Sequence, residues 1–161
     1  MPSRALRRVL VALCVTEIVS YGSLYYAFTV LAPRIAHDTG WSTVAVTAAF
    51  SVGSLVGAAC GIPVGRLLQR FGPRPVMSIG SVVAAGAIAL VATAPSLSGF
   101  FAAWVLVGIS TSGLYYPPAF AALTGWFGSR RVQAITTLTL AAGFASTIFA
   151  PLTSALDSNH E

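Results

Sequence analysis

This sequence of 161 residues has very little charge and contains no lysine. Charged residues make up 8% of it, whereas a soluble domain usually carries about 25%. Because so few charges do not cover a water-facing surface, the composition excludes an ordinary soluble domain. Cysteine is scarce as well. Cys14 and Cys60 lie in separate apolar stretches, and we expect both to be small core residues.

The apolar residues are concentrated in five blocks, roughly 9–31, 44–68, 76–94, 100–123 and 132–156. Each block has about 20 residues, which is the length that a helix needs to cross the hydrocarbon core of a bilayer. Polar breaks marked by arginine separate most of them. The sequence therefore predicts an all-α, polytopic membrane protein with five transmembrane helices.

The arginines fall almost entirely in alternate breaks between these blocks. Eight of the nine precede the first block, separate the second from the third, or separate the fourth from the fifth: Arg4, Arg7, Arg8, Arg66, Arg70, Arg74, Arg130 and Arg131. The opposite breaks hold Arg34, His37 and Asp38, then the uncharged segment 94–98, then Asp157, His160 and Glu161. By the positive-inside rule, the N-terminus is cytoplasmic and the end of this chain lies outside the cell (inner) membrane. The pattern favours a lipid partner and excludes a nucleic-acid partner.

Part of the chain repeats itself. Gly22-Ser23-Leu24-Tyr25-Tyr26 in the first block resembles Gly113-Leu114-Tyr115-Tyr116 in the fourth, and Thr39-Gly40-Trp41 resembles Thr124-Gly125-Trp126. The spacing predicts a repeat of three spans, in which the third span has no counterpart because a sixth is missing. Chance similarity between short apolar strings is the alternative.

Glu17 is the only acidic residue within a predicted span, and it lies near the bilayer midplane. A charge at that depth costs roughly 2.5 to 3.5 kcal/mol. With Tyr21 and Tyr25 it occupies one helical face, so we predict a substrate or coupling-ion site there. A glutamate that is hydrogen-bonded to a neighbouring helix is the alternative.

Tyr115 and Tyr116 are further substrate candidates, because they stand at the matching place in the fourth block. They come just before Pro117-Pro118, which should bend or break that helix. Such breaks are tolerated at membrane depth where they line a cavity. A helix end with interfacial tyrosines is the alternative.

Gly53, Gly57, Gly61 and Gly65 recur every four residues in the second block and form one groove along its helix. A groove of this kind lets another helix approach closely in lipid, so we predict helix packing there. The alternative is the general abundance of glycine in membrane helices.

No catalytic motif accompanies these features. The sequence contains no Ser-His-Asp set, no paired catalytic carboxylates, no phosphate loop and no zinc spacing. We therefore expect no enzyme, no cofactor and no metal site.

The segment Gly65-Arg66-Leu67-Leu68-Gln69-Arg70-Phe71-Gly72-Pro73-Arg74-Pro75 resembles the loop between the second and third helices of major facilitator superfamily transporters. Gly65, Leu67, Arg70, Gly72 and Arg74 match the family motif, and Arg66 adds charge to it. Gln69 stands where the family has aspartate, and Pro73 replaces an arginine. The surroundings of Glu17 and the Thr39-Gly40-Trp41-Ser42 segment are more loosely similar to the monocarboxylate-porter branch.

The resemblance implies alternating access of two six-helix halves around a midplane site, with residues 1–161 as the first five helices of a partial N-terminal domain. It also implies that the loop pairs with the opposite half, and Gln69 weakens that pairing. The expected function is transport of a small organic solute, with a monocarboxylate-like anion and a coupling ion as open additions. These residues alone should be inactive without the C-terminal half or a partner chain. The alternative is a complete five-span membrane protein that binds or scaffolds partners.

Overall fold

A computed structural model describes residues 4–158 of the chain, and all regular structure in that part is helical. The predicted loop residues His160 and Glu161 lie outside the described residues. The elements, in chain order, are α1 (Arg4–Tyr21), η1 (Gly22–Tyr26), α2 (Ala27–Thr39), α3 (Thr43–Phe71), α4 (Pro73–Ala92), α5 (Leu97–Ser112), α6 (Tyr116–Phe127), η2 (Gly128–Arg130) and α7 (Arg131–Ser158). The all-α prediction is confirmed.

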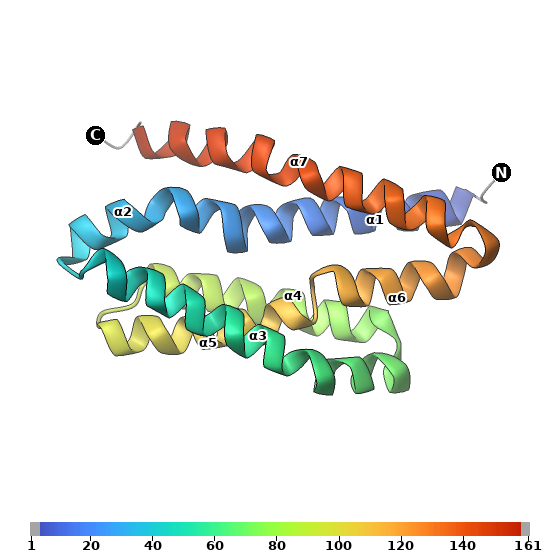
Figure 1. The fold of residues 1–161 in the computed structure, drawn as a ribbon, viewed down its shortest axis with the longest axis horizontal. Coiled ribbons are helices and arrows are strands. Elements are labelled where there is room, and N and C mark those ends of the chain that lie inside the picture. The colour runs from blue at the N-terminus through green and yellow to red at the C-terminus, as the bar shows by residue number, and fades with distance from the viewer. Residues whose placement is uncertain (1–3, 159–161) are drawn as a thin grey trace.

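The helices form a bundle of roughly parallel rods (Figure 1). α1, η1 and α2 join end to end into one rod, and α7 runs along it. α3 packs mainly against α5, and α5 also packs against α4. α6 continues beyond α5 after a short break and contacts both groups of helices.

Four stretches of the described chain are long and apolar enough to cross a membrane: 4–39, 43–71, 73–92 and 97–156. The last has 60 residues, about 90 Å of helix at 1.5 Å per residue, which is far more than one crossing. Figure 1 shows it doubling back where α6 meets α7, so it makes two passes. Where each helix enters the bilayer stays a prediction.

Local capping explains why two helices, α3 and α5, begin before the predicted apolar blocks. Ser42 accepts a hydrogen bond from the Ala45 amide at 3.1 Å and starts α3. Ser96 accepts one from the Gly99 amide at 3.2 Å and starts α5. A serine that satisfies a free amide extends a helix into a polar flank that hydropathy leaves out.

Large apolar side chains on the outside of the bundle support the membrane assignment. Leu55, Ile62, Val82 and Leu140 are 71%, 71%, 74% and 67% exposed. They lie on α3, α4 and α7, so the exposed surface is spread around the bundle. Lipid is the solvent in which such a surface carries no penalty.

The interior contains two clusters of buried side chains. One, around Phe28, Phe100 and Trp104, joins α2, α3, α4 and α5. The other, around Leu13, Leu123 and Leu138, joins α1, α6 and α7. Tyr115 packs against the first cluster and Tyr116 against the second, so these neighbouring tyrosines lie where the two clusters meet.

The breaks that carry arginine come together in space. The start of α1, the α3–α4 junction and the α6–α7 junction all lie at one end of the bundle, on the right in Figure 1. Eight of the nine arginines belong to these three segments. The fold thus gathers at one end the positive charges that the sequence distributes over alternate breaks.

Candidate functional site

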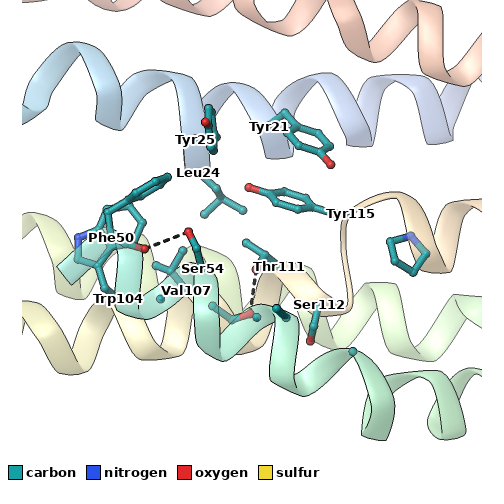
Figure 2. A pocket seen from close by; sticks show the side chains of 16 residues that line it. Tyr21, Leu24, Tyr25, Phe50, Ser54, Trp104, Val107, Thr111, Ser112 and Tyr115 are labelled. Carbon is teal, nitrogen blue, oxygen red and sulfur yellow. Dashed lines mark hydrogen bonds between the residues drawn. The ribbon is translucent and has the colours of Figure 1, made fainter. Parts of the chain in front are cut away.

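A cavity of about 450 Å³ lies between the α1–η1 rod and the pair formed by α3 and α5. Figure 2 shows its walls: Tyr21, Leu24 and Tyr25 on one side, and Phe50, Ser54, Trp104, Thr111 and Ser112 on the other. None of the described residues that line it carries a charge. Its size suits a small organic molecule.

Three of the predicted substrate residues line this cavity: Tyr21, Tyr25 and Tyr115. The rings of Tyr21 and Tyr115 stack with centroids 4.0 Å apart and an angle of 11° between their planes. Tyr116 also lies next to Tyr21, at 5.2 Å between centroids, but it does not line the cavity. Residues that are more than 90 positions apart in sequence therefore form one tyrosine cluster.

Glu17 lies one helical turn before Tyr21 and is completely buried. Neither of its carboxylate oxygens has a hydrogen-bond partner within the described chain. Glu17 shares a helical face with Tyr21, whose ring contacts those of Tyr115 and Tyr116. It does not itself line the cavity, so it sits behind the tyrosine cluster.

Two interruptions of helical geometry flank the cavity. Gly22–Tyr26 forms a π-helical turn, η1, and Gly113–Tyr115 separates α5 from α6. The expected break near Pro117-Pro118 is present, and the prolines lie in the first turn of α6, where their missing N–H groups cost nothing. π-Helical turns inside α-helices occur frequently at functional sites.

These interruptions coincide with the repeated strings. Gly22-Ser23-Leu24-Tyr25-Tyr26 and Gly113-Leu114-Tyr115-Tyr116 both leave α-helical geometry, and both contribute a tyrosine to the cavity. The second pair of strings behaves differently. Gly40 ends α2 with a φ of 71°, whereas Gly125 lies inside α6. The structural correspondence is therefore limited to the segment next to the cavity.

The glycine groove of α3 divides into two parts. A Cβ at Gly53 would meet the Trp104 carbonyl oxygen at 2.5 Å, and one at Gly57 would meet the Gly108 carbonyl oxygen at 2.9 Å. α5 therefore packs closely against this part. Gly61 lines the cavity, and neither it nor Gly65 has an atom within 4 Å of such a Cβ. Packing of another helix against these two stays a prediction.

The arginine-containing loop is a tight turn. α3 ends at Phe71, α4 begins at Pro73, and only Gly72 lies between them, with a φ of 79° that favours glycine. Its amide donates to the Leu68 carbonyl at 2.9 Å. Arg74 lies over the Trp126 ring at 5.4 Å, which connects the turn to α6. The role of Gly65, Arg66, Leu67, Gln69 and Arg70 in conformational change stays a prediction.

The sequence did not indicate the polar side chains on the α3 and α5 side of the cavity. Ser54, Thr111 and Ser112 are ordinary residues of apolar helices, and no spacing separates them from other serines and threonines. Trp104 forms part of the cavity wall, and its buried Nε1 has no hydrogen-bond partner among the residues that the structure describes. The close contact between Gly57 and Gly108 sets how α3 and α5 cross, and this crossing brings the polar side chains to the cavity. The sequence alone does not show which helices pair.

The described residues 4–158 contain no group of three or more His, Cys, Asp or Glu side chains that could hold a metal ion. Apolar helices with exposed apolar side chains around an uncharged cavity define an α-helical integral membrane protein.

Comparison with known proteins identifies the family. Residues 13–160 match the Major Facilitator Superfamily, so the chain belongs to this family of solute transporters. It is 29% identical to rat monocarboxylate transporter 13 over 141 residues, which are 88% of this chain and 31% of the relative. It is 32% identical to human monocarboxylate transporter 11 over 139 residues, 83% of this chain and 28% of the relative.

A third relative is an uncharacterized 38 kDa protein of Thermoproteus tenax, 28% identical over 145 residues, 89% of this chain and 39% of the relative. The chain thus spans about a third of the length of the curated relatives that it matches. No solved structure matches it.

Proposed function

We propose that this chain forms the N-terminal part of a secondary transporter that moves a small organic solute by alternating access, with the cavity as part of the solute path. The observation that carries the proposal is the uncharged cavity of about 450 Å³ between α1–η1 and α3–α5, bordered by a π-helical turn and a helix break. Irregular backbone at membrane depth is tolerated where it lines a cavity.

The solute class to test first is a monocarboxylate, because several relatives bear the name monocarboxylate transporter. Since the chain spans about a third of these relatives, we expect transport to require the rest of the transporter, as further residues or as a partner chain. Glu17 is the candidate coupling group, because it is fully buried and has no hydrogen-bond partner among residues 4–158.

The test is solute uptake into proteoliposomes that contain the natural gene product. We expect saturable uptake of a small organic solute, and a loss of about tenfold or more in Gly61→Leu, because the new side chain fills the cavity. Gly61 has open space around it, so the helix should tolerate leucine. The matched control is Gly86→Leu on α4, which also has open space and lies outside the cavity.

Equal uptake by the Gly61→Leu variant and the native protein would remove the cavity from the solute path. A protein that carries only residues 1–161 should show no uptake above that of empty vesicles. Uptake by that protein would contradict the need for a second half.

We also propose that the arginine end of the bundle is cytoplasmic, in the cell membrane. All three arginine-bearing segments meet at that end (Figure 1), as the positive-inside rule requires of a cytoplasmic face. A reporter enzyme that works only outside the cytoplasm should be active when it is fused after Glu161, and a reporter that works only in the cytoplasm should be inactive there. Activity of a cytoplasmic reporter at this position would reverse the orientation.

A further inference from the structure

We infer that this half of the transporter binds the uncharged end of its solute, an apolar or ring group that carries a hydroxyl, and that a carboxylate, where the solute has one, is bound elsewhere. The inference rests on the proposed function. It assigns a chemical class to the part of the solute that enters the cavity between α1–η1 and α3–α5.

The first argument is the absence of positive charge. No described residue that lines the cavity is an arginine or a histidine, and the chain has no lysine. Glu17, one helical turn from Tyr21, is an acid and supplies no positive charge either. A carboxylate would lose its hydration in the cavity without a cation to compensate.

The second argument is the hydrogen-bonding state of the polar walls. The hydroxyls of Ser54, Thr111 and Ser112 donate to carbonyls of their own helices, at 3.0, 2.8 and 2.6 Å. Two of these hydrogen bonds are drawn in Figure 2. Their oxygens keep lone pairs, so toward a ligand they act as acceptors. A carboxylate only accepts, whereas an alcohol donates as well.

The remaining polar groups fit an alcohol too. The phenols of Tyr25 and Tyr115, which line the cavity, can donate or accept. An alcohol hydroxyl can satisfy donors and acceptors at once. The rings of Phe50 and Trp104, with centroids 5.2 Å apart, form an aromatic wall for the apolar part of the solute.

The test compares two ligands of similar size, cyclohexanol and cyclohexanecarboxylate, by calorimetric titration of the protein in nanodiscs at neutral pH. Empty nanodiscs correct for partitioning into lipid. We expect saturable binding of cyclohexanol and binding of cyclohexanecarboxylate that is at least about tenfold weaker, since one unpaired buried charge costs more than that factor. Gly61→Leu should abolish cyclohexanol binding, and Gly86→Leu should leave it unchanged.

Two outcomes overturn the inference, and they separate it from the proposed function. Equal or tighter binding of cyclohexanecarboxylate, lost in Gly61→Leu, would show that the cavity takes the anionic end, and the solute path through it would stand. If Gly61→Leu removes the binding of neither ligand, the cavity binds neither the alcohol nor the carboxylate. The effect of Gly61→Leu on uptake then decides whether the proposed function fails as well.

Discussion

Replacing Glu17 with glutamine in the natural gene product is expected to lower proton-driven uptake by about tenfold or more, because an amide neither takes up nor releases a proton. Exchange of solute between the two sides, without a proton gradient, should continue. The structural reason is the position of Glu17 behind the tyrosine cluster, where it is fully buried and has no hydrogen-bond partner in the described part of the chain. The measurement is uptake into proteoliposomes with and without an imposed pH gradient.

The same position allows a test of stability. A buried carboxyl without a partner costs about 1 to 3 kcal/mol, so Glu17→Met, of similar length, should raise the free energy of unfolding by about that amount. Equilibrium unfolding in mixed detergent micelles measures this free energy. Higher stability together with lost coupling identifies a functional group that the fold tolerates at a cost. Unchanged proton-driven uptake in Glu17→Gln would instead make Glu17 a packing residue.

Replacing Gly108 with leucine should destabilise the bundle by about 3 kcal/mol or more, at or above the upper end of the cost of overpacking. A Cβ on Gly108 would overlap the backbone of Gly53, and backbone atoms cannot move aside as a flexible side chain can. The substitution therefore separates α3 from α5, the pair that forms one wall of the cavity. Thermal unfolding in detergent, followed by helical circular dichroism, measures the loss.

The matched control is Gly86→Leu, in a helix interior with no atom within 4 Å of a new Cβ. It should unfold at the native temperature or slightly above it, because leucine favours a helix more than glycine does. Equal unfolding temperatures for Gly108→Leu and Gly86→Leu would show that α3 and α5 do not pack closely at Gly108. Gly53→Leu should reproduce the Gly108→Leu result, since it blocks the same crossing from the other helix.

Much of the fold was predictable because it depends on hydropathy and charge, which can be summed over consecutive residues. The apolar blocks have the length of a bilayer crossing, and the arginines alternate between breaks. The break near Pro117 was predictable for a local reason, since proline lacks the amide that a helix interior needs. The positions of Tyr21, Tyr25 and Tyr115 as candidates came from helical spacing and from the repeat. Their roles stay predictions.

Other features depend on which helices become neighbours. Gly57 and Gly61 belong to the same four-residue repeat and both line the cavity, but Gly108 lies close to Gly57, whereas a Cβ on Gly61 would meet no atom within 4 Å. The stacking of Tyr21 on Tyr115 has the same origin. The π-helical turn at Gly22–Tyr26 carries no signal in hydropathy, because it changes the backbone register within an apolar helix.

The sequence by itself determined that this is an all-α membrane protein. It also determined which breaks between the apolar blocks carry the positive charge and which family the chain resembles, because hydropathy, charge and a short motif are local properties. Only the tertiary structure decided where the cavity lies, that its walls are uncharged, and that Ser54, Thr111 and Ser112 face it. These depend on close contact between helices far apart in sequence. In lipid that contact is selected by the fit of backbones and side chains, since burial of apolar surface does not distinguish one neighbour from another.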